Sequence, residues 1–583
     1  MFMMIVRIFF SYIYKYIYIA IYKYVEQYMH YMTKYMDRQQ QGPVLCLKQG
    51  KIQGVIKYNV CSNNDNYLAF RGIPYAKPPI GELRFQDPLP AEGWNGIRDG
   101  SKFGNISIQL TTSGKVIGSD DCLYLNVYKS KRIEMFAKLP VMVWIHCGGF
   151  YLGSGNDAMC SPDYIIRKDI ILVTFNYRLG VLGRHALGFL NLEHEVAPGN
   201  QGLKDQVMAL RWVRDNIEVF GGDPQNVTIF GGSAGAASVH YLTISPLAEG
   251  LFHKAIAQSG TAINSWAYTS DEPRRYGYQL SSMLGFESCD PEAVVDFLRK
   301  VDVKKLVKYQ SYVIPEDKLT MFSPFLPGVD YKSKNPFLAQ PPEVAMQLGT
   351  KVPFMLGFNG MEGSFFMGVH KISSTIFERI RQLKATFKDL ISPYLAKKLQ
   401  DKNITINDFE RLYFGEKLFS ADLSKNVMHF LGDVLFLHHI FELARTLQKI
   451  NKYPVYLYKF SYDSTNATFM KTAMCIQIPG PTHGDELFYM FYGKFQEYLS
   501  LKPHSPGTKD YKIMEYFTQL WTDFAKTGNP TPTTTELIPV LWEPLEKNAN
   551  EYNYFNIDEN LGMERIPIGA QRFEWNTIRK RNL

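Results

Sequence analysis

Apolar runs of strand length alternate with helical patterns from about Gly42 onward, and this alternation restricts the chain to few folds. The strand-like runs are residues 141–145, 170–175, 352–357 and 455–460. The first two are continuously apolar, as expected for central strands that helices cover on both faces. Residues 203–220 carry a helical pattern that ends at a Gly-Gly-Asp-Pro turn. The pattern predicts an α/β protein with a large, mainly parallel sheet flanked by helices.

The length of 583 residues favours two or more domains, because a single core rarely grows this large. The sequence nevertheless shows no internal repeat and no linker that would divide it after residue 41. Apolar residues make up 46% and charged residues 21% of the chain, as in ordinary globular proteins. We therefore expect one large domain over residues 42–578.

Residues 1–41 form an atypical leader that is rich in Met, Ile and Tyr. Arg7 and Lys15 interrupt its apolar runs before they reach the length of about 20 residues that spans a membrane. Three interpretations compete: an irregular membrane anchor, a disordered segment, or translated upstream sequence with the true start at Met36. We favour the last, which predicts that mass spectrometry of the natural protein finds no peptide from residues 1–35. We expect no membrane span after Met36.

The formal net charge is +8, but Lys and Arg are interspersed with Asp and Glu, which argues against a nucleic-acid partner. The seven cysteines are odd in number and scattered, and no Cys or His spacing indicates a metal site. We therefore expect reduced thiols, an intracellular protein (cytosolic or microsome-associated), and neither metal nor cofactor. The leader leaves a membrane or secretory route open.

The segment Gly231-Gly232-Ser233-Ala234-Gly235 matches the G-x-S-x-G pattern of a nucleophile elbow. Residues 227–230 before it are β-branched and aromatic, as in a buried strand, and the Ala-rich residues 234–240 favour a helix. A sharp strand-to-helix turn holds a serine in a strained conformation with its hydroxyl exposed. Ser233 is therefore the candidate nucleophile.

A serine hydroxyl needs a base to take its proton, and the base needs a carboxylate to fix its tautomer. At a nucleophile elbow the acid and then the histidine follow the serine along the chain. Glu362 lies in a Gly-flanked loop after the run 352–357, and His483 lies between turn signals and an apolar stretch. We predict that Glu362 is the acid and His483 is the base.

Two consecutive glycines, Gly148 and Gly149, follow the run 141–145. Such glycines allow backbone N–H groups to approach the oxyanion of a tetrahedral intermediate closely. We predict an oxyanion hole formed by the N–H groups of Gly148, Gly149 and Ala234.

With these residues and several further motifs, the chain resembles type-B carboxylesterases of the cholinesterase-like α/β-hydrolase family, and insect α-esterases most of all. The further motifs are Phe70-Arg71-Gly72-Ile73-Pro74-Tyr75-Ala76, Gly118-Ser119-Asp120-Asp121-Cys122, Asn176-Tyr177-Arg178-Leu179-Gly180, Gly202-Leu203-Lys204-Asp205-Gln206 and Phe220-Gly221-Gly222-Asp223-Pro224. The resemblance implies the α/β-hydrolase fold and a triad of Ser233, Glu362 and His483. It also implies that Ser259 supplies a supporting hydroxyl close to the triad.

The resemblance further implies a serine carboxylesterase that cleaves carboxylic esters to alcohol and carboxylate through an acyl-enzyme, in xenobiotic or dietary ester metabolism. It implies small-molecule ester substrates, inhibition by organophosphates, and no obligate protein partner. The alternatives are a juvenile-hormone-type esterase, or a weakly active or non-catalytic member of the family that acts as a binding protein.

Four departures from the family pattern narrow these expectations. Ser107 stands where secreted relatives have the cysteine that pairs with Cys122, so we expect this disulfide to be absent. The segment 107–122 is short and lacks tryptophan, which argues against choline esters. Cys147 replaces the first glycine of the usual three; if this position requires a positive φ, the side chain strains the oxyanion loop and Cys147→Gly raises activity. Residues 184–188 resemble a short insertion near the site.

Overall fold

The computed structural model describes residues 40–574 apart from 112–113, 181–186, 270–272, 310–324, 368–398, 402–403, 406–407, 409–410, 414, 416–423, 467, 474–477 and 571. Residues 1–39 of the leader, and the predictions made for them, lie outside the described residues. Gln40 and Gln41 already belong to the first strand.

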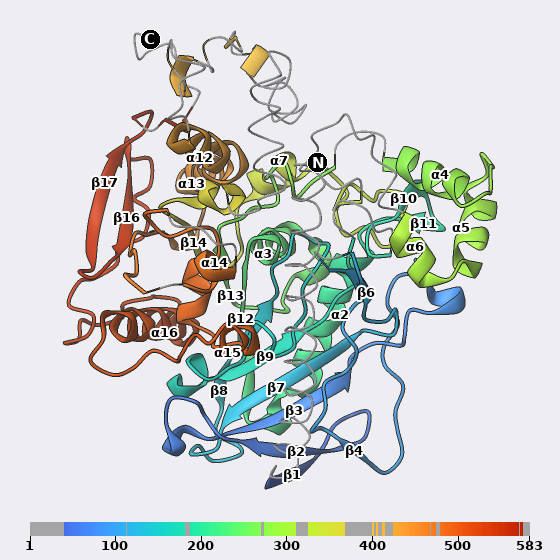
Figure 1. The fold of residues 1–583 in the computed structure, drawn as a ribbon, viewed down its shortest axis with the longest axis horizontal. Helices are drawn as coiled ribbons and strands as arrows, with labels where there is room; N and C mark the ends of the chain where they lie inside the picture. The colour runs from blue at the N-terminus through green and yellow to red at the C-terminus, as the bar shows by residue number, and fades with distance from the viewer. Residues whose placement is uncertain are drawn as a thin grey trace, which may run out of the picture.

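Thirteen strands form one central sheet within the described residues (Figure 1). In order across the sheet they are β1 (Gln40–Cys46), β2 (Lys51–Lys57), β3 (Tyr67–Pro74), β7 (Tyr124–Ser130), β9 (Ile171–Phe175), β8 (Leu139–Ile145), β12 (Gly222–Gly232), β13 (Lys254–Gln258), β14 (Phe354–Asn359), β15 (Val455–Phe460), β16 (Glu551–Ile557) and β17 (Gly562–Pro567), with β4 (Ile97–Asp99) paired to β2. Every strand from β9 to β16 runs parallel to its neighbours within this series. On either side of this series the neighbouring strands are antiparallel, except that β4 pairs with β2 in parallel. The predicted mainly parallel α/β architecture is confirmed.

The predicted strands lie where the apolar runs indicate, with one displacement. Residues 455–460 coincide with β15, whereas the run 352–357 is shifted, because β14 begins at Phe354 and ends at Asn359. Pro353 has no N–H to donate to a strand ladder. Gly357 lies within the strand and does not end it. A Cβ at this position would lie 2.0 Å from the Tyr458 ring, so the close packing of β14 on β15 requires glycine here. The predicted helix over 203–220 is α2 (Gln201–Asn216) followed by a 3₁₀ turn, η4 (Ile217–Phe220).

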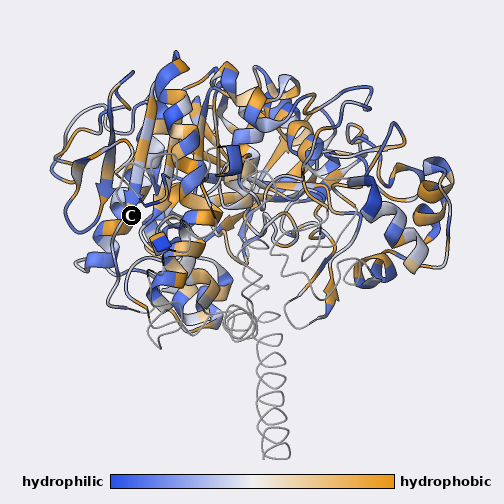
Figure 2. Cartoon of the chain, turned by 90° about the horizontal axis from the view of Figure 1, so that it is seen from above, coloured by the Kyte–Doolittle hydropathy of each residue, from blue (hydrophilic) through white to orange (hydrophobic). Residues whose placement is uncertain are grey.

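Alternate residues of β8 enter two hydrophobic cores, one on each face of the sheet. Val143 belongs to the core covered by α2, α3 (Ala234–Ile244) and α13 (His438–Ile450). Trp144 belongs to the core covered by α16 (Lys509–Thr527). Hydrophobic residues accordingly colour much of the central strands and of the helices packed on them (Figure 2).

The remaining elements surround the central sheet and the helices that cover its two faces. Helices α4, α5 and α6 gather with β10 and β11 at one end of the molecule (Figure 1). The bounds are α4 (Pro273–Met283), α5 (Pro291–Lys300), α6 (Val303–Tyr309), α7 (Pro342–Ala345), α12 (Ser424–Gly432), α14 (Phe469–Ala473), α15 (Lys494–Tyr498), β5 (Gln109–Leu110), β6 (Val116–Ile117), β10 (Asn191–His194) and β11 (Ala197–Pro198).

Helices α12 and α13 are joined by a π-helical turn, η9 (Asp433–Leu437), into one continuous helix, Lys425–Ile450. By length and composition this is the one helix among the described residues that could cross a membrane, which the sequence had not led us to expect. In the structure 89% of its most apolar window is buried within the protein, as in the core helix of a globular fold.

Candidate active site

The carboxyl ends of neighbouring parallel strands bring the predicted site residues to one edge of the sheet. Strands β8, β12, β13 and β14 are neighbours in this order. Their ends lead into Gly148, Ser233, Ser259 and Glu362, respectively. This edge is where open parallel sheets place their ligand-binding and catalytic groups.

The strained turn expected at Ser233 is present between β12 and α3. Ser233 has φ 56° and ψ −120°, a backbone conformation that residues other than glycine rarely adopt. Gly231 and Gly235 allow the turn to close: a Cβ on Gly235 would lie 2.0 Å from the carbonyl oxygen of Ile145, and one on Gly231 would lie 2.7 Å from the same oxygen. The elbow therefore packs directly against the end of β8.

Glu362 and His483 form a close pair, although they come from different loops. Glu362 begins the 3₁₀ turn η8 (Glu362–Met367), and its Oε2 lies 2.6 Å from Nδ1 of His483. Its Oε1 accepts hydrogen bonds from the Ser259 hydroxyl at 2.5 Å and from the N–H of Asn359 at 2.7 Å. With Glu362 ionised, Nδ1 carries the proton and Nε2 has a free lone pair, the tautomer that a general base needs.

Ser233 and His483, both within the described residues, are not hydrogen-bonded to each other. The only hydrogen bond of the His483 ring in this part of the chain is the one to Glu362. A nucleophile and its base are often separated in a site without substrate and come together in the substrate complex. The structure thus brings Glu362, His483 and Ser259 into contact, and places Ser233 at the same edge of the sheet.

The three predicted oxyanion donors are available. Within the described residues the N–H groups of Gly148, Gly149 and Ala234 donate no hydrogen bond. Gly148 and Gly149 have φ values of +117° and +61°. A Cβ would lie 2.0 Å from the Leu152 carbonyl oxygen at the first and 2.2 Å from the Tyr151 ring at the second, so both positions require glycine.

The expectation that Cys147 strains this loop is wrong. Cys147 is not among the described residues with positive φ; the non-glycine residue of this loop that has one is Phe150, at 65°. The backbone turns one residue later than the strain argument assumed. Burial raises the pKa of the Cys147 thiol to about 11, so the side chain stays a neutral thiol beside the loop.

Aromatic rings enclose His483, and sequence reasoning missed them. The Phe436 ring lies 4.3 Å from the imidazole, centroid to centroid, at 33°, and the Phe365 ring lies at 5.5 Å and 78°. Phe436 comes from the π-helical turn η9, far from His483 in sequence. No local signal in the sequence marks these contacts, because they form only in the folded protein.

A second buried carboxylate, Glu486, lies behind the pair. Burial and the neighbouring charge of Glu362 raise its pKa to about 7. It accepts hydrogen bonds from the side-chain amides of Asn359 at 2.5 Å and Gln258 at 3.3 Å. Asn359 therefore donates to both carboxylates, through its backbone to Glu362 and through its side chain to Glu486. Neither Asn359 nor Glu486 was predicted, since nothing in the local pattern distinguishes them from ordinary loop residues.

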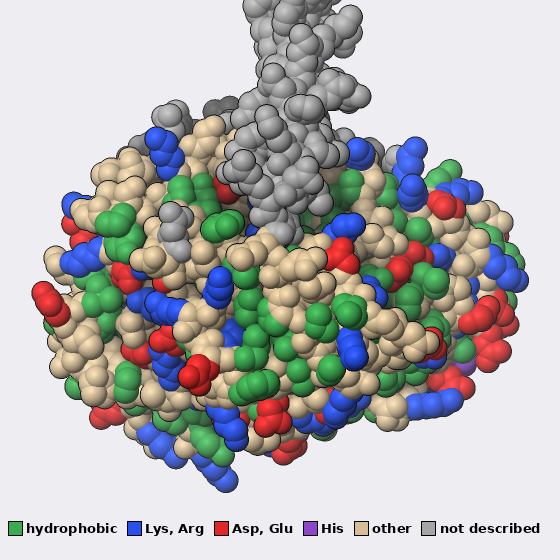
Figure 3. All heavy atoms as spheres, turned by 90° about the horizontal axis from the view of Figure 1, so that it is seen from below, with side chains coloured by type: hydrophobic (Ala, Val, Ile, Leu, Met, Phe, Trp, Pro, Cys, Tyr) green, Lys and Arg blue, Asp and Glu red, His purple; other side chains and the backbone are tan. Residues whose placement is uncertain are grey.

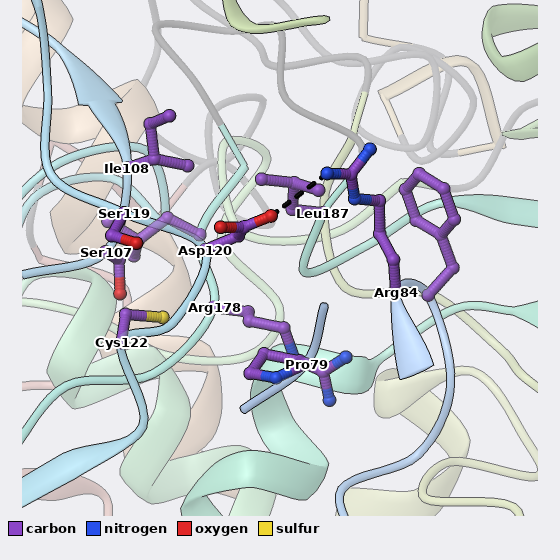
Figure 4. Close-up of a pocket in the computed structure, with 11 residues that line it drawn as sticks. Pro79, Arg84, Ser107, Ile108, Ser119, Asp120, Cys122, Arg178 and Leu187 are labelled. Atoms are coloured by element: carbon purple, nitrogen blue, oxygen red, sulfur yellow. Dashed lines mark hydrogen bonds and ion pairs between the residues drawn. The ribbon is translucent and has the colours of Figure 1, made fainter. Parts of the chain in front are cut away.

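Cys122 lies beside Ser107 in a small pocket of about 10 Å³ (Figure 4). Cys122 is a free thiol, which confirms that the disulfide of secreted relatives is absent. The Ser107 hydroxyl instead donates to the carbonyl of Tyr177 at 2.7 Å. Leu187, which belongs to the predicted insertion, also lines the pocket, while residues 184–186 lie outside the described residues.

On the face shown in Figure 3, basic and acidic side chains are interspersed. In the described part of the chain no group of three or more His, Cys, Asp and Glu side chains is placed to hold a metal ion.

Comparison with known proteins places this site in a family. Residues 41–573 match the model of the carboxylesterase family. The chain is 36% identical over 517 residues to juvenile hormone esterase of Tribolium castaneum, covering 84% of each chain. It is 32% identical over 564 residues to a carboxylic ester hydrolase of Bombus ignitus, covering 93% of this chain and 95% of the other.

Solved structures agree with this assignment. The crystal structure of juvenile hormone esterase from Manduca sexta, with OTFP covalently attached, superposes with a TM-score of 0.78 at 28% identity, covering 93% of this chain and 99% of that one. PNB esterase superposes with a TM-score of 0.69 at 28% identity, covering 91% and 99%. The predicted α/β-hydrolase fold is confirmed, and the chain belongs to the carboxylesterase family.

Proposed function

We propose that this carboxylic ester hydrolase uses Ser233 as its nucleophile, His483 as its general base and Glu362 as the carboxylate that orients the base. The observation that carries the proposal is the 2.6 Å contact between His483 and Glu362 at the same sheet edge as the strained Ser233. Ser259 supports the pair, because its hydroxyl donates to the Glu362 oxygen that does not face His483.

In the first half of the reaction, the Ser233 oxygen attacks the ester carbonyl while its proton moves to Nε2 of His483. Glu362 stabilises the imidazolium that results. The carbonyl oxygen becomes an oxyanion, and the unused N–H groups of Gly148, Gly149 and Ala234 are its donors. A single donor of this kind contributes a factor of about 100 to 1,000 to kcat.

In the second half, the tetrahedral intermediate collapses and the alcohol leaves with the proton held by His483. Ser233 now carries the acyl group as an ester. His483 then takes a proton from water while the water oxygen attacks the acyl carbon. The second tetrahedral intermediate collapses as His483 returns this proton to the Ser233 oxygen, and the carboxylic acid is released and ionises to the carboxylate. No metal or cofactor takes part in this sequence.

We infer that the substrates are small aliphatic and aromatic esters, of xenobiotic or dietary origin. The support is the set of aromatic rings around His483, with Trp266 packed against Phe436 at 5.8 Å, since such walls favour apolar groups. Organophosphates are expected to inhibit by phosphorylating Ser233. Juvenile hormone is the second candidate substrate, because juvenile hormone esterases of three insects are among the similar proteins.

An intracellular location is part of the proposal. It is supported by Cys122, which remains a thiol where secreted relatives form a disulfide, and by the unpaired state of the other described cysteines. Fractionation of cells that express the full chain tests it: activity in the cytosol or microsomes supports it, and activity in the medium refutes it.

Hydrolysis of naphthyl acetate and of juvenile hormone by the wild type and Ser233→Ala tests the function. We expect turnover by the wild type and a loss of at least about 10,000-fold in the variant, since the nucleophile is gone. Ser282→Ala, which removes an exposed hydroxyl on α4, is the matched control. The ratio of the two wild-type rates separates the substrate candidates, and a wild type inactive on both esters contradicts the proposed function.

A further inference from the structure

The π-helical turn η9 places an aromatic face against the candidate base. In this turn the Phe436 ring lies against the His483 ring, with the centroids 4.3 Å apart and the planes tilted by 33°. A ring centroid within about 6 Å is close enough for a cation over an aromatic face to be attracted by the ring quadrupole. π-Helical turns inside α-helices are rare and are found mostly at functional sites.

Side chains around the turn hold Phe436 in this position. The carbonyl of Leu435 accepts hydrogen bonds from Nε1 of Trp266 at 2.7 Å and from the side-chain amide of Asn264. The Trp266 ring packs against Phe436 at 5.8 Å, and the Phe366 ring stacks on it at 6.3 Å. The wider turn and these contacts fix the ring of Phe436 against the imidazole.

The same helix also abuts the acid of the pair. Gly363, next to Glu362, packs so closely on α12 that a Cβ there would lie 1.9 Å from the carbonyl oxygen of Met428. Gly432, directly before η9, is in turn close to Gly363. One continuous helix therefore supports Glu362 at its first half and His483 at its π-helical turn.

We propose that Phe436 is a positioning residue that orients His483 and stabilises its protonated form during ester hydrolysis. The inference rests on the proposed function, in which His483 becomes an imidazolium twice in each cycle. The imidazolium then lies between the Glu362 carboxylate and the aromatic face of Phe436, both of which attract a positive charge. A neutral imidazole gains much less from the ring, so the effect favours the charged state.

Besides the uncharged Phe436 ring, two carboxylates influence the charge state of His483. Glu362, from η8, contacts Nδ1, and Glu486, from η10 (Asp485–Tyr489), lies close enough for the two charges to interact. Phe365 from η8 adds an uncharged ring. All of these groups remain in a Phe436 variant, so a change in the protonation of His483 in that variant reports the loss of the aromatic face.

Phe436→Leu tests the inference, because leucine keeps the apolar bulk and removes the ring. We expect kcat for naphthyl acetate to fall about 3- to 30-fold. The acid limb of the kcat/KM profile is expected to move to lower pH by about half a unit or more, since the imidazole becomes harder to protonate. Phe436→Tyr keeps the aromatic face and should restore both values. Phe297→Leu, which removes a ring on α5 that stacks on Phe286 at 4.8 Å, is the control and should leave the acid limb in place.

A graded series removes the risk that Phe436→Leu misfolds. Mono-, di- and trifluorophenylalanine at position 436 keep the ring shape and progressively weaken its negative face. Stepwise loss of kcat and a stepwise shift of the acid limb support the inference, and a flat series overturns it. NMR titration of His483 in the same proteins gives the pH readout without turnover. An inactive wild type overturns the proposed function alone, whereas an active wild type with a flat series overturns the role of Phe436 alone.

Discussion

For single residues in the site, backbone conformation and free space decide which side chains the site tolerates. Gly148 combines a φ of +117° with a Cβ position 2.0 Å from a carbonyl oxygen, so no other residue fits there. Cys147 lies one residue earlier, and its φ is not positive. Its backbone is therefore not strained, although it replaces a glycine of the family pattern. A family pattern therefore identifies an unusual position, but only the backbone shows whether the substitution costs anything.

We accordingly expect Cys147→Gly to leave kcat for naphthyl acetate within about twofold of the wild type, because no strain is released. Added backbone freedom should instead lower stability by about 0.5–1 kcal/mol. Steady-state kinetics and thermal unfolding of the two proteins check both values. A several-fold gain in kcat would show that the thiol does disturb the oxyanion loop.

Ser259→Ala removes the 2.5 Å hydrogen bond to Oε1 of Glu362. Hydrogen bonds to charged groups contribute about 1.5–3 kcal/mol, so we expect kcat to fall about 10- to 100-fold with a small change in KM. Ser282→Ala is again the control for loss of a hydroxyl. If Ser259→Ala matches that control in kcat, Ser259 does not support Glu362 during catalysis.

The candidate residues found from the sequence share one property: a recognisable local sequence pattern surrounds each of them. Ser233 and Gly148 follow strands and carry glycine spacing, and Glu362 and His483 occupy loops marked by turn residues. No such pattern surrounds Asn359, Glu486 or Phe436, because their roles arise from contacts in the folded protein. A search restricted to motifs misses residues of this second kind.

Among the secondary-structure elements, close backbone approaches position the site. The elbow, the oxyanion loop and η8 each depend on a glycine that lies against a neighbouring carbonyl oxygen. The strands could be predicted because their apolar runs are long and continuous. The bounds of β14 and the π-helical turn η9 could not be predicted, since no local pattern in the sequence marks them.

Gly235→Ala tests the close approach at the elbow. The added methyl would meet the Ile145 carbonyl oxygen at 2.0 Å, so α3 must move away from β8. We expect a loss of about 1–3 kcal/mol in the free energy of unfolding and nearly complete loss of esterase activity. The matched control is Gly562→Ala in β17, where no atom lies within 4 Å of the new methyl. Equal activity of the two variants would mean that the elbow does not need this glycine.

For the whole molecule, length alone favours several domains, whereas the absence of linkers and repeats in the sequence favours one domain, and this stays a prediction. Among the described residues, thirteen strands form the central sheet, which has a hydrophobic core on each face. The order of the strands could not be predicted, because it depends on how parallel strands far apart in sequence select their neighbours.

Buried carboxylates make global stability depend on pH. The pKa of Glu486 is raised to about 7 by burial and by Glu362, so the folded state favours the protonated form. The stabilisation is full below about pH 4.5 and is lost as pH rises through about 7. Glu486→Gln keeps a neutral side chain at all pH values. Its free energy of unfolding relative to the wild type should therefore rise by up to about 3 kcal/mol between acidic pH and pH 8.

Denaturant unfolding of both proteins at several pH values provides the measurement. Groups that do not interact with Glu486 titrate alike in both proteins, so their contribution cancels in the difference. A difference between the variant and the wild type that stays constant with pH would show that Glu486 does not titrate in this range.

The whole proposed mechanism depends on Ser233 as the residue that carries the acyl group. Covalent labelling with a fluorophosphonate, followed by proteolysis and mass spectrometry, identifies that residue. We expect one adduct, on the peptide that contains Ser233, formed in parallel with the loss of naphthyl acetate hydrolysis and absent from Ser233→Ala. Full esterase activity in Ser233→Ala, or an inactivating adduct on a different residue, would contradict it.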